Sequence, residues 1–197
     1  MKILAITDMH GSSKAFKELK NKSPKADLII NAGDFSIFEQ KMDEFFEKMS
    51  KLKKPLLLIH GNHEMEEDCV QAELFESIEF IHKKEHIIDN YLFLGWGGGG
   101  FSRIEKEFEK QAEKWLKKIK KIKPEKLILI THAPPYNTKL DLVYGEHAGN
   151  KSIKKFVIKA KPDLVICGHL HENSGVEHKI GKTLIINPGP YGKFIEL

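Results

Sequence analysis

Residues 28–36 read LIINAGDFS, a short and mostly apolar run that leads directly into a glycine and an aspartate. Such a run is typical of a central strand that is buried on both faces of a sheet. Open α/β sheets build their sites just beyond the carboxyl ends of such strands, so Asp34 stands where a functional side chain is expected. Similar runs predict strands at Ile3 to Thr7, Leu28 to Ala32, Leu56 to His60, Tyr91 to Gly95, Leu127 to Thr131, Leu164 to Cys167 and Leu184 to Ile186.

Between these runs, the apolar residues recur at helical spacing. Two long amphipathic helices are predicted, one over Ile37 to Leu52 and one over Ile104 to Ile122. Shorter helices are expected to begin near Ser12 and near Asn150 or Ser152, because these residue types cap helix N-termini. The alternation of strand-like and helix-like periods indicates an α/β fold.

Five polar clusters follow the apolar runs, and each lies at the carboxyl end of its run. They are Asp8-x-His10, Gly33-Asp34, Gly61-Asn62-His63-Glu64, His132 and Gly168-His169-x-His171. Carboxylates, imidazoles and an amide are ligand types for divalent cations such as Mn, Fe, Ni and Zn. Because there are too many for one tetrahedral ion, the sequence predicts a site for two metal ions. If the D-x-H and H-x-H segments are extended, residues two apart present their side chains to the same side.

In this order, the clusters resemble the calcineurin-like metallophosphoesterase superfamily, whose pattern runs D-x-H, G-D, G-N-H-[DE], H and G-H-x-H. The resemblance covers nearly the whole chain. It implies a four-layer α/β/β/α sandwich with two mixed central sheets, and we expect residues 1–197 to form a single domain of this kind.

The resemblance also implies a division of roles among these residues. Asp8, His10, Asp34 and His171 would hold one ion, with Asp34 bridging to a second ion that Asn62, His132 and His169 complete. We expect two divalent ions, manganese first, with nickel, iron, zinc, magnesium and cobalt as alternatives. Asn62 and His63 would contact the substrate, and His63 would be the catalytic residue that protonates or polarises the leaving group.

The implied reaction is hydrolysis of a phosphate ester by in-line attack of a hydroxide that bridges the two metal ions. Many members of the superfamily continue G-D-x-x-D, but this chain has Ile37 in place of the second acid. His63 would therefore be held by Glu64, by a backbone carbonyl, or less tightly. The run Gly33-Asp34-Phe35-Ser36 resembles a smaller branch with G-D-F-[ST], which implies small phosphodiesters, such as cyclic nucleotides, as substrates.

Other functions stay open at this point. The same ligands serve phosphomonoesterases and nucleases, and a related fold without an intact ligand set serves as a protein-binding scaffold. A closed structural zinc site is a further alternative, although such sites are usually rich in cysteine and these clusters contain none. His147 could reach the cavity, Arg103 could clamp a phosphate, and Gly97 to Gly100 are expected to form a turn rather than a phosphate cradle.

Composition sets the outer limits on function. The chain has 197 residues, 41% hydrophobic and 30% charged, with a formal net charge of +4. Lysines alternate with core-facing residues, which indicates a solvated helix face rather than a nucleic-acid surface. No apolar run approaches the roughly 20 residues that span a bilayer. We therefore expect a cytoplasmic protein whose partner is a small phosphate-ester substrate, neither membrane nor nucleic acid; its oligomeric state is not readable from the sequence.

Overall fold

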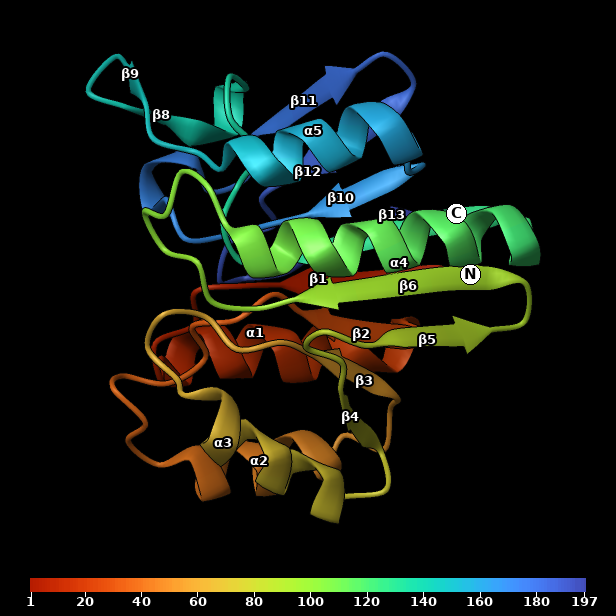
Figure 1. Ribbon diagram of the computed structural model, residues 1–197. Coiled ribbons are helices and arrows are strands. Elements are labelled where there is room, and N and C mark those ends of the chain that lie inside the picture. Colours follow the sequence, from red (N-terminus) through yellow and green to blue (C-terminus); the bar gives the residue numbers. More distant parts are fainter.

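The computed structural model describes residues 1–197 and shows two β-sheets packed face to face, with helices on both outer faces (Figure 1). This is the expected four-layer α/β/β/α sandwich, so the predicted fold is confirmed. None of the helices is long and apolar enough to cross a membrane.

The first sheet has the strand order β13-β1-β2-β3-β4. Its strands are β1 (Lys2–Ile6), β2 (Leu28–Asn31), β3 (Leu56–Leu58), β4 (Ile78–Phe80) and β13 (Lys193–Glu196). Strands β1 to β4 run parallel, and β13 pairs antiparallel with the outer edge of β1. In this register Ile6 lies beside Asn31, and Asn31 beside Leu58, so the carboxyl ends of three strands are level.

The second sheet has the order β11-β12-β10-β7-β6-β5. Its strands are β5 (Glu85–Ile88), β6 (Tyr91–Trp96), β7 (Lys126–Thr131), β10 (Leu164–Ile166), β11 (Glu177–Ile180) and β12 (Thr183–Ile186). The four inner strands are parallel, and the two edge strands are antiparallel to their neighbours. A separate two-stranded hairpin, β8 (Leu142–Val143) and β9 (Glu146–His147), follows β7.

Helices cover the outer faces of both sheets. Helices α1 (Ser13–Lys22) and α2 (Met42–Ser50) pack on the first sheet, and α4 (Lys106–Ile122) and α5 (Lys151–Ala160) lie side by side in front of the second (Figure 1). The short α3 (Glu66–Cys69) precedes the 3₁₀ turn η2 (Val70–Leu74). The other 3₁₀ turns are η1 (Ser23–Lys25), η3 (Lys139–Asp141) and η4 (His171–Asn173).

The strands alternate their side chains between two interiors, as the two-residue period of a strand requires. In β1, Ile3 and Ala5 face the second sheet, whereas Leu4 and Ile6 pack beneath the helices. The space between the sheets is filled almost entirely by aliphatic side chains such as Ile30. This rigid double sheet fixes the positions of the strand ends.

The loops that follow β1, β2, β6 and β10 lie on one side of the molecule, at the left in Figure 1. Backbone hydrogen bonds join the strand ends within each sheet: Asp8 N, after β1, donates to Gly33 O, after β2 (3.0 Å), and Gly168 N, after β10, donates to His132 O, after β7 (2.9 Å). The Gly98 N–H donates to the His60 carbonyl (3.0 Å) and so connects the two sheets at this end.

All seven predicted strands are present, most with shifted ends, but β4, β5, β8, β9, β11 and β13 were not predicted. The prediction of a helix from Ile37 is wrong in its first turns. Ile37 and Phe38 lie in the loop after β2, Phe38 has a left-handed backbone (φ 46°), and α2 begins at Met42. Ile104 likewise precedes α4. Helices α1 and α5 begin after Ser12 and Asn150, as expected.

Candidate metal centre

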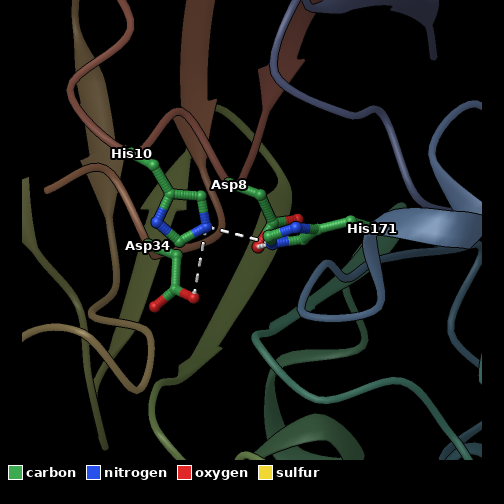
Figure 2. A group of neighbouring side chains, drawn as sticks. All are labelled: Asp8, His10, Asp34 and His171. Carbon is green, nitrogen blue, oxygen red and sulfur yellow. Dashed lines mark hydrogen bonds and ion pairs between the residues drawn. The ribbon is translucent and has the colours of Figure 1, made fainter. Parts of the chain in front are cut away.

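Four of the predicted ligands meet at the carboxyl ends of the first sheet. Asp8 and His10 follow β1, Asp34 follows β2, and His171 comes from η4, after β10 of the other sheet. Figure 2 shows the side chains converging, and their ligand atoms all lie within 4.8 Å of one another. Nε2 of His10 lies 3.0 Å from Nε2 of His171 and 3.8 Å from Oδ2 of Asp34.

A second group of ligand atoms shares Asp34 with the first. It consists of Asp34, His132 after β7 and His169 after β10. Nε2 of His132 is 3.4 Å from Oδ2 of Asp34 and 3.1 Å from Oδ1 of Asn62. The structure thus brings all seven predicted metal ligands into two adjoining groups, with Asp34 between them.

Hydrogen bonds on the far sides of two imidazoles favour cation binding. Nδ1 of His10 lies 3.2 Å from the Ser36 carbonyl, and Nδ1 of His132 lies 2.8 Å from the Ala32 carbonyl. Because a carbonyl only accepts, both Nδ1 atoms carry hydrogen, and in the neutral rings Nε2 presents its lone pair to the centre. These carbonyl partners have no sequence signature.

Acceptor atoms therefore crowd together at the centre. Nε2 of His169 is buried with no hydrogen-bond partner. Nitrogen and oxygen lone pairs that face one another repel unless a cation or a proton lies between them. The donor set, the orientation of the rings and this unpartnered nitrogen all fit divalent metal ions.

The pKa values of the buried carboxylates and imidazoles at the centre reflect this crowding of acceptor atoms. Burial alone would raise the pKa of Asp34, but the hydrogen bond and charge of His132 hold it well below its usual range. Burial would lower the pKa of His132, yet the hydrogen bond and charge of Asp34 and the charge of Asp8 raise it to about 9. Burial raises the pKa of the Asp8 carboxyl. For the His169 imidazole, burial and the charge of His132 together lower the pKa to about 4. Without a metal, a proton on His132 thus balances Asp34.

The backbone at the ligands differs from the extended form expected from the sequence. Asp8, His10, Asp34 and His169 all have positive φ, between 44° and 71°. This left-handed conformation is strained for residues with a Cβ. The loops turn sharply at each ligand, and the turn, rather than an extended i, i+2 repeat, aims the side chains at the centre.

Two glycines beside the ligands permit close packing of the loops. A Cβ at Gly61 would overlap the carboxylate of Asp34, and a Cβ at Gly168 would overlap the hydroxyl of Thr7. Glycine at these two positions lets the strand ends approach closely enough for the ligands to meet.

Glu64 does not hold His63, contrary to one of the possibilities left open by the sequence. Its carboxylate is buried and accepts hydrogen bonds from the backbone N–H groups of Gly61, Asp34 and Ser36 and from the Ser36 hydroxyl, at 2.8 to 3.0 Å. Glu64 therefore joins the loops after β2 and β3 and fixes the backbone of Asp34.

The His63 ring is held by other rings. It stacks on Phe38 (centroids 4.4 Å apart) and meets the edge of His10 (4.6 Å). Its Nδ1 is buried without a partner, while its backbone N–H donates to Oδ1 of Asp34 (2.9 Å). Sequence reasoning missed Phe38, because it placed that residue on a helix.

The other two proposed contacts, His147 and Arg103, are bonded to residues outside the two ligand groups. Nδ1 of His147 binds Oδ1 of Asp141 (2.8 Å), and the Arg103 guanidinium donates to the His147 carbonyl (2.9 Å). Both residues thus stabilise the β8–β9 hairpin. Gly98, Gly99 and Gly100 have positive φ, so this run forms the expected turn.

A third group of potential ligands, formed by His60, Glu66 and His82, fits a metal ion poorly. Nδ1 of His82 accepts the Gly97 N–H (2.7 Å), so the hydrogen of the neutral ring is on Nε2, which faces Oε2 of Glu66 at 3.4 Å. Nε2 of His82 therefore has no lone pair to offer. This cluster is a hydrogen-bonded support for the glycine turn.

The sequence of this chain matches a known protein family and a relative from another organism. The sequence profile of the calcineurin-like phosphoesterases matches residues 1–173. The uncharacterized protein MJ1162 of Methanocaldococcus jannaschii is 32% identical over 207 residues, which cover 99% of this chain and 91% of that protein.

Solved structures share the fold at lower identity. The crystal structure of TT1561 of Thermus thermophilus has a TM-score of 0.75 at 20% identity, over 96% of this chain and 89% of that one. A novel archaeal phosphodiesterase has a TM-score of 0.54 at 18% identity, over 96% and 84% of the two chains. The profile match covers most of the chain and all five clusters, so this protein belongs to the calcineurin-like phosphoesterase family.

Proposed function

We propose that this protein hydrolyses small phosphodiesters, cyclic nucleotides or similar esters, at a centre of two divalent metal ions, with manganese as the working metal. The observation that carries the proposal is the pair of ligand groups that share Asp34. Asp8, His10, Asp34 and His171 would hold one ion, and Asp34, Asn62, His132 and His169 the other. When bound, such ions neutralise charge on a phosphoryl group and make water more acidic.

The residues of the chain would orient the reaction. The carbonyls of Ser36 and Ala32 fix the rings of His10 and His132, and Glu64 fixes the backbone at Asp34. Asn62 would also contact the phosphate. His63, next to His10, would donate a proton to the oxygen of the leaving group, a role that suits an imidazole near neutral pH.

The charges around the centre support a diester substrate. A monoester carries about one negative charge more than a diester near neutral pH, which favours sites with an additional free cation. Here Lys41 and Lys48, beside the loop after β2, both pair with Glu44, at 3.9 and 2.6 Å. These two lysines are therefore balanced by a carboxylate instead of being free for a second phosphate charge.

The archaeal phosphodiesterase shares the fold with this chain, but at 18% identity the likeness supports the architecture alone. The substrate is therefore best tested directly. The protein should be stripped with chelator and reloaded separately with Mn, Ni, Mg and Zn. Each form should then be assayed on bis-p-nitrophenyl phosphate, p-nitrophenyl phosphate and cyclic nucleotides.

We expect manganese to restore diester hydrolysis and to restore monoester hydrolysis far less. Hydrolysis of monoesters alone would contradict the diester proposal. Inactivity with every metal and ester would contradict the enzymatic proposal and favour a binding role for the fold.

A further inference from the structure

Two exposed phenylalanines lie against the candidate metal centre, one from each sheet. Phe38, in the loop after β2, stacks on His63 with 4.4 Å between ring centroids, and Phe101, in the loop after β6, meets His169 edge-on at 4.5 Å. Their exposed fractions are 71% and 67%. Each ring therefore touches a site histidine and still presents most of its surface to solvent.

The exposure of these two rings is unlike that of the other phenylalanines. The other ten all lie in the hydrophobic clusters or pack against them, as Phe46 and Phe108 do. An exposed phenylalanine leaves favourable burial unused, which marks it as a candidate contact for another molecule when it borders a site. Both exposed rings border the same site.

Hydrogen bonds hold the backbone next to each phenylalanine, although most of each ring is exposed to solvent. Next to Phe38, Glu39 N donates to the His63 carbonyl (3.1 Å). Phe38 itself has φ 46°, a conformation that is rare for a bulky residue and typical of functional loops. The bond from Glu39 helps to hold this strained backbone in place, with the ring against His63.

The loop that carries Phe101 is fixed on both sides. Ser102 N donates to the Gly99 carbonyl (2.7 Å), the Asn150 amide donates to the Ser102 carbonyl (2.8 Å), and Lys151 N donates to the Arg103 carbonyl (2.7 Å). An exposed ring on an anchored loop loses little conformational entropy when it contacts a ligand.

From this geometry we propose that Phe38 and Phe101 contact the ester groups of the substrate and select esters that carry a flat aromatic or heteroaromatic ring. The inference rests on the proposed function. A phosphate at the centre would project one ester group toward each sheet, where a phenylalanine offers its face or edge. Aromatic and nucleobase rings pack on such side chains through apolar area and offset stacking.

The test keeps the leaving group constant and varies the second ester. Manganese-loaded wild-type protein and the variants Phe38→Leu, Phe101→Leu and the double variant are assayed on thymidine 5′-p-nitrophenyl phosphate and ethyl p-nitrophenyl phosphate. Leu74→Ala is the control, because Leu74 is 83% exposed but lies on η2, apart from the ligands.

We expect wild-type and control proteins to prefer the thymidine ester. The variant at the phenylalanine that faces the second ester should raise KM for the thymidine ester by about threefold to tenfold, the range that loss of one aromatic contact implies, and KM for the ethyl ester by less than about twofold. The variant at the phenylalanine that faces the p-nitrophenyl group should raise KM for both esters by a similar factor, because both carry that ring. Equal loss of kcat on both esters would overturn the proposal, since the rings would then serve to position His63 and His169.

A binding measurement separates this inference from the proposed function. Calorimetric titration of the manganese-loaded proteins with phenylphosphonate and ethylphosphonate requires no turnover. Wild-type protein should bind phenylphosphonate more tightly, and the double variant should bind the two alike. Equal affinities in wild-type protein would overturn the role of the rings even if diesters are hydrolysed. If no ester is hydrolysed, the proposed function fails while the titration still reports on the rings.

Discussion

At the residue scale, the contacts of His63 separate this side chain from the predicted metal ligands. It contacts Phe38 and His10 but belongs to neither group of converging ligand atoms. We therefore predict that His63→Ala lowers kcat by roughly a hundredfold or more, the usual effect of losing an acid–base group, while bound manganese stays near wild type. Metal content is measured by mass spectrometry on the dialysed protein.

His147→Ala is the matched control, because that ring lies on the hairpin and contacts Asp141 instead of the centre. It should keep both activity and metal. His10→Ala should lose metal. If His63→Ala loses both ions as well, His63 is a ligand and its assignment to the substrate is wrong.

Glu64 has a structural role that its neighbours define. Its buried carboxylate accepts four hydrogen bonds, three from backbone N–H groups and one from Ser36. In Glu64→Gln the new amide group would face donors, so we predict a loss of about 3 kcal/mol in the free energy of unfolding. Urea denaturation of the metal-free protein measures it.

Glu44→Gln provides the comparison, since Glu44 is solvent-exposed and forms surface ion pairs with lysines. Its effect should be much smaller. Equal midpoints and slopes for Glu64→Gln and wild-type protein would show that the Glu64 hydrogen bonds do not stabilise the loops.

At the scale of elements, the two capped helices begin differently. Ser12 caps α1 by accepting from Ala15 N. Asn150 caps α5 by accepting from Ile153 N and also donates to the Ser102 carbonyl and to Glu105. Ser12→Ala should cost about 1 kcal/mol of unfolding free energy, and Asn150→Ala about 2 to 3 kcal/mol.

Urea denaturation of both variants measures the two losses on the same scale. The larger loss is expected for Asn150→Ala because this side chain joins a helix start to the loop that carries Phe101. Equal losses would show that the bonds to Ser102 and Glu105 contribute nothing to stability.

Strands that are buried on both faces could be predicted from the sequence, and strands at the sheet edges could not. Strands such as β2 are buried on both faces and read as apolar runs, whereas β5 and β11 lie at sheet edges, and their charged and polar residues, such as Glu85 and Glu177, hide the strand period. The helix predicted from Ile37 is wrong only in its first turns: the apolar residues there have helical spacing, but Ser36 is bonded to Glu64 and Glu39 N to the His63 carbonyl, which holds this segment as a loop. Local spacing could not report those long-range bonds.

For the candidate site, the ligand types and their order could be predicted from the sequence, because each follows a strand whose end the fold fixes. The carbonyl partners of His10 and His132 could not be predicted, because every residue has a carbonyl. The positive φ of Asp8 and Asp34 also has no marker in the sequence. Turns and backbone contacts depend on how the two sheets meet.

At the scale of the whole molecule, His82 lies where the sheets meet, in a parallel bridge with Gly95 of β6. Burial, together with the charges of His60 and Lys83, lowers the pKa of His82 to about 2. Glu66 also faces the ring. Between pH 2 and the ordinary histidine pKa of 6.5, the unfolded chain binds a proton at His82 that the folded protein does not.

Stability contributed by neutral His82 should therefore be present above about pH 6.5 and fall on acidification, by about 1.4 kcal/mol per pH unit. We predict that His82→Gln flattens this part of the curve. Urea denaturation of the chelator-treated proteins from about pH 7 to about pH 4 measures the difference between them. Parallel curves for the two proteins would contradict the shifted pKa.

The left-handed backbone of the ligands has a consequence for how this protein would change under selection. His10 and His169 occupy a conformation that costs a residue with a Cβ about 1 kcal/mol or more, and that glycine adopts freely. Variants selected for thermal resistance alone, in the presence of chelator, should accumulate glycine at these positions. Persistence of histidine there in any lineage would then report continued use of the centre.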